Sequence, residues 1–205
     1  MLEVTKLDCV RGDRRLFSDI NLSLKPGMLV EVQGANGSGK TSLLRILGGL
    51  LAPARGEVRW QGENIRSLGE EYFTAVTYIG HRSAVKEELT CLENHRISNG
   101  LAGVEVTKQQ AVETLEKMGL AGREHLAARF LSEGQRRRLA LSRLLASSTR
   151  LWLLDEVLTS LDRAASRLIT SVIEAHLKGG GMAVVATHQE LNFAAGSFER
   201  LQLTT

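Results

Sequence analysis

The chain has 205 residues, 43% of them hydrophobic, and a net charge of +3. This size favours a single domain with a real core, and the small positive charge fits work near phosphates or an anionic membrane surface without indicating nucleic-acid binding. The two cysteines, Cys9 and Cys91, have no paired spacing, which argues against a disulfide framework or a zinc site and favours a reducing cytosol. No signal peptide or membrane span is apparent, since the most apolar runs, 151–154 and 182–186, are only as long as a strand.

Apolar runs of strand length alternate with helical patterns, which predicts an α/β fold with a mostly parallel sheet. The expected strands of this sheet are 28–33, 75–80, 150–156 and 182–188. The expected helices are about 40–48, 107–118, 133–146 and 162–177. In the first sixty residues, apolar and polar residues alternate in "LEVTKLDCV", "INLSLK" and "GEVRWQGE", which indicates an antiparallel β layer. We expect one domain over 1–205, with a helical subdomain at about 84–146.

The segment "GANGSGKT" at 34–41 fits the pattern G-x-x-x-x-G-K-[ST] between a predicted strand and a predicted helix. Its glycines let backbone N–H groups approach phosphate oxygens, and the positive end of the helix adds to this attraction. We expect Lys40 to reach the β- and γ-phosphates of a nucleoside triphosphate, and the Thr41 hydroxyl to bind Mg²⁺. The predicted nucleotide-binding residues here are Gly34, Ala35, Asn36, Gly37, Ser38, Gly39, Lys40, Thr41 and Ser42. The alternative, a glycine-rich turn without a ligand, leaves the lysine and the threonine unexplained.

The segment "LWLLDE" ends an apolar strand with two carboxylates, Asp155 and Glu156. At the carboxyl edge of a parallel sheet, Asp155 suits a partner of Mg²⁺. Glu156 suits a base that polarises the attacking water. An acidic turn after a strand is common, so the pair indicates this chemistry mainly because the chain also has the phosphate loop.

The segment "LSEGQRRRLALSRLL" begins with Ser132 and Gln135 at the spacing of a helix capping box. A helix start explains much of the pattern, but Gly134 in the first turn costs about 1 kcal/mol relative to alanine. A helix N-terminus with serine and glycine is also a phosphate site. The arginines at 136–138 are expected to be solvated or paired with nearby acidic groups, since adjacent residues point in different directions on a helix.

Five segments, "GANGSGKT", "LSEGQ", "LWLLDE", "SLD" and "TH" at 187–188, stand in the order typical of ATP-binding cassette (ABC) ATPases. The chain resembles this family over nearly its whole length, and "LSEGQ" is the most discriminating segment because ordinary phosphate-loop NTPases lack it. The resemblance implies a phosphate-loop NTPase core with a parallel sheet, an antiparallel β layer and an inserted helical subdomain. It also implies hydrolysis of ATP with Mg²⁺.

The resemblance further implies a head-to-tail dimer of two copies of the chain. ATP held by Lys40 of one copy would be covered by the signature residues of the other, Ser132, Glu133, Gly134 and Gln135. Asp162 would lie along the dimer seam. His188 would contact the γ-phosphate and the water region near Glu156.

Three positions depart from the family pattern. His81 stands where the family usually has a glutamine that touches Mg²⁺ and senses the membrane partner, and an imidazole titrates near neutral pH. Arg11 stands where an aromatic residue usually stacks on adenine, although a guanidinium can also stack on a base. Val157 replaces the proline that is common after the acidic pair.

The short single cassette and the segments "IGH", "LTCLEN", "LSEGQRRRLALSRL" and "THQELN" resemble the ATP-binding subunits of the haem exporter of bacterial cytochrome c maturation. This resemblance implies a peripheral ATPase on the cytoplasmic face of the inner membrane, with integral-membrane subunits as partners. ATP hydrolysis would drive release of a haem-loaded chaperone or export of haem.

Three other interpretations stay open from the sequence. One is the ATPase subunit of another importer or exporter. A second is a cassette protein that acts on DNA or ribosomes, but the interval from 40 to 132 has no room for a long coiled coil and the chain has one cassette, so we expect no nucleic-acid partner. A third is a haem-binding protein, because Cys91 and His95 lie four apart on an expected helix, but no C-x-x-C-H motif occurs.

Overall fold

The computed structural model describes residues 1–159, 161–188 and 197–203. The chain forms two compact units. Unit 1 comprises Met1–Ile79, Thr149–Glu156 and Glu174–Thr205, and unit 2 comprises Gly80–Ser148 and Val157–Ile173. The range 84–146, expected as a helical subdomain, falls inside unit 2.

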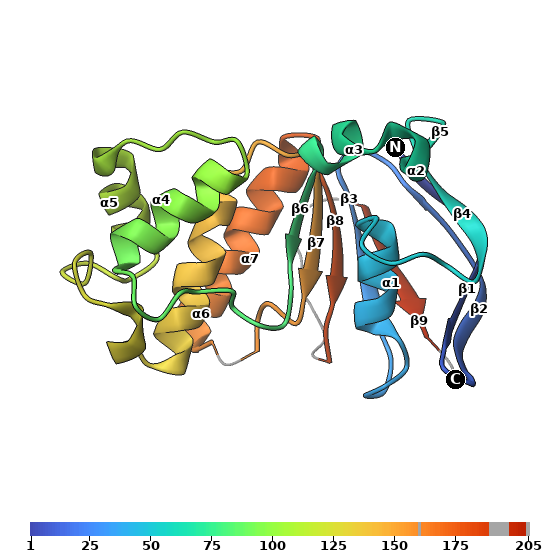
Figure 1. Cartoon of the computed structure of the whole chain (residues 1–205), viewed down its shortest axis with the longest axis horizontal. Helices are drawn as coiled ribbons and strands as arrows, with labels where there is room; N and C mark the ends of the chain where they lie inside the picture. The colour runs from blue at the N-terminus through green and yellow to red at the C-terminus, as the bar shows by residue number, and fades with distance from the viewer. Residues whose placement is uncertain (160, 189–196, 204–205) are drawn as a thin grey trace. The chain divides into compact units, whose positions relative to one another are not determined.

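A five-stranded parallel sheet forms the centre of unit 1, in the order β6-β7-β8-β3-β9 (Figure 1). Its strands are β3 (Met28–Gln33), β6 (Val76–Ile79), β7 (Leu151–Asp155), β8 (Met182–Ala186) and β9 (Ser197–Gln202). Every residue of β7 and β8 is buried, as expected of inner strands covered on both faces. The four strands predicted from apolar runs are confirmed. The edge strand β9 was missed because "SFERLQ" has no continuous apolar run.

An antiparallel sheet, in the order β2-β1-β4-β5, forms a second layer of unit 1 and confirms the predicted antiparallel β layer. Its strands are β1 (Leu2–Arg11), β2 (Arg14–Leu24), β4 (Arg55–Trp60) and β5 (Glu63–Asn64). In β1 the buried positions change from even numbers, Leu2 and Val4, to odd numbers, Leu7 and Cys9. A register shift between Val4 and Leu7, where Lys6 has φ 47°, accounts for this change of face.

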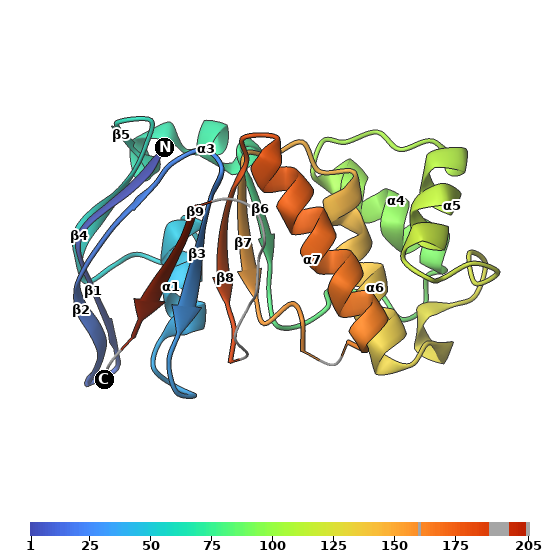
Figure 2. The same ribbon diagram turned by 180° about the vertical axis from the view of Figure 1, so that it is seen from behind.

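Helix α1 (Lys40–Leu47) lies between the two sheets, as Figures 1 and 2 both show. Its inner residues Leu43, Leu44, Ile46 and Leu47 are fully buried in a core that also takes side chains from both sheets. Burying leucine or isoleucine contributes about 1.5–3 kcal/mol per side chain, so this helix is held firmly at the ends of the parallel strands. Two short helices, α2 (Ile65–Leu68) and α3 (Glu70–Thr74), were not predicted.

Unit 2 is mainly helical within the described residues. Its elements are α4 (Cys91–Leu101), α5 (Lys108–Lys117), α6 (Glu133–Leu141), two 3₁₀ turns, η1 (Ala128–Phe130) and η2 (Ser142–Leu145), and the first part of α7 (Arg163–Lys178). Capping boxes open α4, α5 and α6. The boxes of α5 and α6 were predicted, whereas Thr90 and Glu93 of α4 were missed although they have the same spacing.

The predicted helix at 133–146 changes its geometry near its end. It is α-helical only to Leu141 and continues as the 3₁₀ turn η2. The Ser142 hydroxyl donates to the Leu139 carbonyl oxygen at 2.7 Å, a local bond that competes with regular helix geometry.

The same hydroxyl joins a buried polar network around His95, which is completely inaccessible to solvent. Because Ser142 Oγ donates to Leu139, it accepts from Nδ1 of His95, at 2.7 Å. The Asn99 amide nitrogen lies 3.3 Å from Nε2 of the ring. Both ring nitrogens therefore have partners, and the Cys91–His95 pair gains no support as a haem site. Burial lowers the pKa of His95 to about 4.

We expect this histidine to make stability depend on acid pH. Its native pKa lies below the unfolded value of 6.5, so the unfolded chain binds the proton first as the pH falls. The free energy of unfolding should therefore drop by about 2 kcal/mol between pH 7.5 and pH 5 on account of this residue. Urea unfolding of the parent and of His95→Gln at both pH values measures it. A variant that loses as much stability as the parent over this range would contradict a buried neutral imidazole.

Candidate nucleotide-binding site

The candidate site lies at the carboxyl edge of the parallel sheet of unit 1. Strands β7, β8 and β3 are neighbours, and each ends beside a segment with polar groups. The phosphate loop follows β3, Asp155 ends β7 and precedes Glu156, and Thr187 and His188 follow β8. Parallel strands end at the same edge of a sheet, so segments distant in the sequence meet there.

Two glycines of the phosphate loop are required by their surroundings. Gly39 has φ 104°, and a Cβ atom there would lie 2.9 Å from Cδ1 of Phe17. A Cβ atom on Gly34 would lie 2.5 Å from Oγ of Ser38. The Ser38 side chain is buried, and its hydroxyl has no hydrogen-bond partner within the described part of the chain. At Gly34 and Gly39 the loop thus has room for backbone but not for a side chain.

Lys40 begins helix α1 and is 6% exposed. Its Nζ donates to the carbonyl oxygens of Gly34 at 2.8 Å and Ala35 at 3.2 Å, so the ammonium lies against the loop. The first N–H groups of the helix have no acceptor inside it and carry partial positive charge. Lysine and helix end together form an anion site.

A pocket of about 360 Å³ opens at this loop. It is lined by Arg11, Leu16, Asn36, Gly37, Gly39, Lys40, Thr41, Ser42 and Glu156. Arg11 thus lines the same pocket as the phosphate-loop residues, and its stacking on a base stays a prediction. None of the residues lining this pocket is aromatic.

Two oxygen-bearing side chains meet at the base of the loop. The Thr41 hydroxyl donates to Oδ2 of Asp155 at 2.9 Å, and Asp155 is 1% exposed. No group of three or more His, Cys, Asp or Glu side chains among the described residues forms a metal site by itself. A hydroxyl and a buried carboxylate are oxygen ligands of the kind that Mg²⁺ prefers when phosphates complete its coordination, so these residues fit that ion.

The side chains of Glu156 and His188 are in close contact at the same edge. Glu156 Oε1 lies 2.7 Å from Nε2 of His188. The Glu156 N–H donates to the Ala186 carbonyl oxygen at 2.9 Å, and the residue has φ 52°. This left-handed conformation costs about 1–2 kcal/mol for a residue with a Cβ atom, and such strain clusters at functional sites.

The remaining predicted site residues belong to unit 2, and their roles toward a nucleotide stay predictions. Ser132 caps α6, with its Oγ accepting from the Gln135 N–H at 3.3 Å. Asp162 precedes α7, and its Oδ1 accepts from the Ala165 N–H at 2.8 Å. His81 is exposed and follows β6 by two residues.

The expectation that the arginines at 136–138 are solvated or paired with acidic groups is confirmed for Arg136, whereas Arg137 is buried instead of solvated. Arg136 pairs with Glu87 at 3.7 Å. Arg137 is buried, and its Nη1 donates to the carbonyl oxygens of Gly80 at 3.1 Å and His81 at 3.0 Å. Arg138 Nη1 donates to the Met118 and Gly119 carbonyl oxygens that follow α5. Helix ends and loops leave carbonyls without partners, and the buried Arg137 and the half-buried Arg138 satisfy them here.

Within the described ranges, no helix is long and apolar enough to cross a membrane.

A phosphate loop at a helix N-terminus, with oxygen ligands and a carboxylate–imidazole pair at the same sheet edge, defines a nucleotide-binding protein of the phosphate-loop ATPase class. The model of the ABC transporter family matches residues 17–159. Proteins described as "Cytochrome c biogenesis ATP-binding export protein CcmA" are similar along nearly their whole length. The protein from Nitrosospira multiformis is 56% identical over 203 residues, covering 99% of this chain and 98% of the relative. The one from Nitrosomonas europaea is 52% identical over 204 residues, covering 100% and 96%.

Solved structures support the fold. An ABC transporter ATP-binding protein from Pyrococcus furiosus matches with a TM-score of 0.83 and 24% identity, covering 98% of this chain and 96% of that one. The ATP-binding cassette MJ0796, in a dimeric post-hydrolysis state with ADP and phosphate, matches with a TM-score of 0.80 and 24% identity, covering 92% and 88%. The chain belongs to the ABC transporter family, in the group of cytochrome c biogenesis ATP-binding export proteins, and is an ATPase of the ABC type.

Proposed function

We propose that this protein hydrolyses Mg-ATP as a head-to-tail dimer and thereby drives release of a haem-loaded chaperone or export of haem in cytochrome c biogenesis. The relatives with more than half of their residues identical carry the name of this export system. The observation that carries the chemistry is the meeting of the phosphate loop, the Thr41–Asp155 pair and the Glu156–His188 pair at one sheet edge.

The phosphate loop binds the triphosphate in this proposal. Lys40 Nζ exchanges its loop carbonyl partners for oxygens of the β- and γ-phosphates, and the N–H groups at the start of α1 face the same anion. Thr41 and Asp155 would hold Mg²⁺, which supplies neutralisation of charge on the phosphates.

Glu156 acts as the base in this proposal. Its carboxylate takes the proton of the attacking water, and the 2.7 Å contact with His188 orients the carboxylate. The left-handed backbone of Glu156 sets the direction in which its carboxylate points, and a residue in an unstrained conformation would point elsewhere. His188 also reaches toward the γ-phosphate.

The second copy completes the site. Ser132, Glu133, Gly134 and Gln135 at the N-terminus of its α6 cover the nucleotide, and its Asp162 lies along the seam. The N-terminal N–H groups of α6, the serine hydroxyl and the small Gly134 suit close approach to phosphate. His81 stands in place of the family's glutamine, and its imidazole would take that residue's place toward Mg²⁺.

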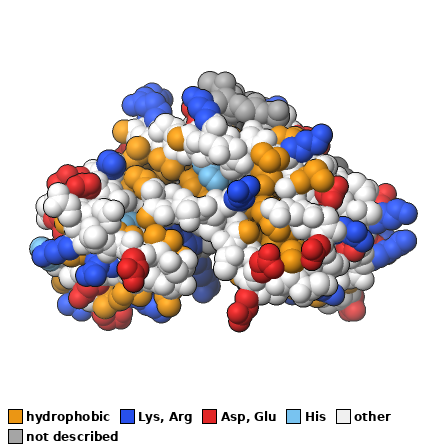
Figure 3. Space-filling view, turned by 90° about the horizontal axis from the view of Figure 1, so that it is seen from above, with side chains coloured by type: hydrophobic (Ala, Val, Ile, Leu, Met, Phe, Trp, Pro, Cys, Tyr) orange, Lys and Arg blue, Asp and Glu red, His pale blue; other side chains and the backbone are white. Residues whose placement is uncertain are grey.

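The membrane subunits dock at the end of unit 1 opposite the phosphate loop. Helix α1 begins at the loop, and its eight residues carry the chain about 12 Å away. There Leu50 is 58% exposed and Phe73 is 50% exposed, and the two flank Gly49. Figure 3 looks onto the side of unit 1 where α2 and α3 lie in Figure 1 and shows hydrophobic side chains gathered between charged ones.

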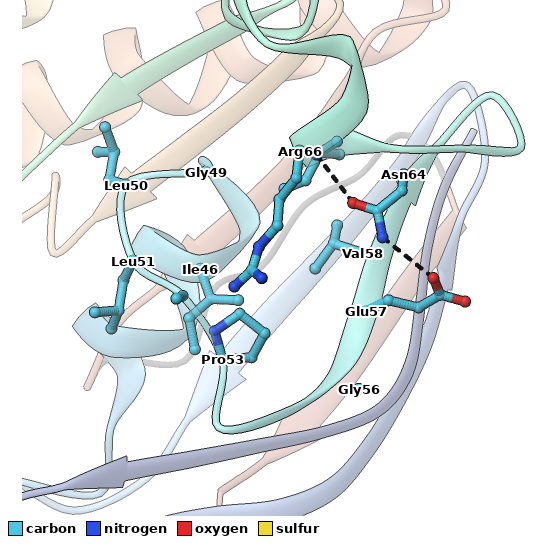
Figure 4. A pocket seen from close by; sticks show the side chains of 12 residues that line it. Ile46, Gly49, Leu50, Leu51, Pro53, Gly56, Glu57, Val58, Asn64 and Arg66 are labelled. Atoms are coloured by element: carbon cyan, nitrogen blue, oxygen red, sulfur yellow. Dashed lines mark hydrogen bonds between the residues drawn. The ribbon is translucent and has the colours of Figure 1, made fainter.

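A pocket of about 280 Å³ lies at the same end of α1. Figure 4 shows Arg66 extending toward Ile46 and Pro53, while Asn64 accepts from the Arg66 N–H and donates to Glu57. Exposed apolar residues beside a pocket are typical of a protein interface. This surface supports a peripheral place on the cytoplasmic face of the inner membrane, bound to integral-membrane subunits.

Complementation of a bacterium that lacks its own cytochrome c biogenesis ATP-binding protein tests the proposal. We expect this chain to restore haem-stained c-type cytochromes and to co-purify with membrane subunits, and Glu156→Gln to co-purify without restoring them. A chain that hydrolyses ATP yet restores no cytochrome, and co-purifies with subunits of another transporter, would replace the proposal by the other-exporter interpretation.

A further inference from the structure

A large aromatic side chain, Phe130, is exposed in unit 2 just before the signature residues. It is 65% exposed, and among the exposed large hydrophobic residues of the described chain only Leu101 is more exposed. The Arg129 guanidinium carbon lies 4.9 Å from the centroid of its ring. An exposed ring with a guanidinium on one face leaves its other face available for a stacking partner.

The backbone that carries the Phe130 ring is held in place by its surroundings. Its neighbours Ala128 and Leu131 are buried. The backbone N–H groups of Ala128 and Arg129 donate to the Leu89 and Glu87 carbonyl oxygens at 2.9 and 3.0 Å. The position of Phe130 within unit 2 is therefore set by packing and by backbone hydrogen bonds.

The chain between Phe130 and the signature is extended. Leu131 has φ −79° and ψ 146°, and Ser132 has φ −63° and ψ 163°. Two extended residues span about 7 Å, and the phenyl side chain adds to that reach. This reach allows one nucleoside triphosphate to contact both the ring and Ser132.

The nucleotide pocket of unit 1 lacks an aromatic residue that could stack on a nucleobase. Its lining includes Arg11, at the end of β1, and Leu16, in β2. No residue of this lining is aromatic. A base without an aromatic partner forgoes stacking that is worth about 1–3 kcal/mol per base in nucleic-acid complexes.

We propose that Phe130 of a second copy stacks on the nucleobase of ATP held in the pocket of the first copy. The base then lies between this ring and the Arg11 side, and Arg129 occupies the other face of the ring. This inference rests on the proposed head-to-tail dimer, in which Ser132 of the second copy meets the γ-phosphate. It makes base recognition a property of the dimer.

Dimer formation of the Glu156→Gln protein, followed by light scattering over a range of ATP or UTP concentrations, tests the inference. We expect Phe130→Ala to raise the ATP concentration at half dimerisation about tenfold and the UTP concentration less, because purine stacking is stronger. Phe130→Trp should keep the parent's values. Leu101→Ala, which removes a similarly exposed side chain from the same unit, is the matched control and should change neither.

Two results would overturn the inference, and they differ in what they mean for the proposed function. If Phe130→Ala dimerises at the parent's ATP concentration and with the parent's ratio of ATP to UTP, the base is not recognised by this ring although the dimer stands. If the Glu156→Gln parent itself stays monomeric at saturating Mg-ATP, the head-to-tail dimer fails and this inference fails with it.

Discussion

Lys40→Ala should abolish ATP binding and, with it, ATP hydrolysis. Lys40 is the side-chain cation of the phosphate loop, and its Nζ already lies 2.8 Å from a loop carbonyl where the phosphates are expected. Removing a buried charge that pairs with a phosphate costs about 3 kcal/mol or more, which lowers affinity at least about 100-fold. Calorimetric titration with Mg-ATP measures the binding, and release of inorganic phosphate measures the turnover.

A matched control separates the loss of this charge from the loss of any lysine. Lys25 is exposed in the turn between β2 and β3, outside the pocket lining, so Lys25→Ala should bind and hydrolyse ATP like the parent. Unchanged ATPase activity in Lys40→Ala would remove the phosphate-loop assignment altogether.

Glu156→Gln should bind Mg-ATP, hydrolyse it at least about 100-fold more slowly than the parent, and accumulate as a dimer. The amide keeps the size of the carboxylate and can still contact His188, but it cannot take a proton from water. Because the nucleotide is not consumed, the state in which it is shared by two copies persists. Phosphate release gives the rate, and light scattering gives the mass of the complex.

The control for this variant is Glu70→Gln on α3, an exposed carboxylate that should leave both rate and mass unchanged. Turnover of Glu156→Gln at the parent's rate would show that another group takes the proton. A monomer at saturating Mg-ATP would count against a site shared between copies.

Much of the local architecture was predictable because it depends on neighbours in the chain. The strands β3, β7 and β8 are inner strands of a parallel sheet, so their sequences are mostly apolar, with Glu31 as the charged exception in β3. The capping boxes at Thr107 and Ser132 are formed by residues three positions apart. The phosphate loop is equally local, since its glycines, lysine and threonine lie within eight residues.

Other parts of the site were absent from any local pattern. The Thr41–Asp155 bond joins residues 114 positions apart. The identity of both residues was foreseen from motifs, but their contact depends on the pairing order of β3, β8 and β7. The left-handed conformation of Glu156 likewise depends on its N–H bonding to Ala186 in the neighbouring strand segment.

The arginines after the signature and the edge strand β9 show most clearly which features depend on tertiary structure. Residue types and short spacings of this chain determine its strands, helix starts and phosphate loop, because those depend on hydrogen bonds and rotamers within a few residues. The burial of Arg137 against the Gly80 and His81 carbonyls, the His95–Ser142 contact and the parallel pairing of β9 with β3 were decided only in the tertiary structure. Tertiary packing determines which distant polar groups are buried next to one another. A buried polar group needs a hydrogen-bond partner among those neighbours, and that partner can lie anywhere in the sequence.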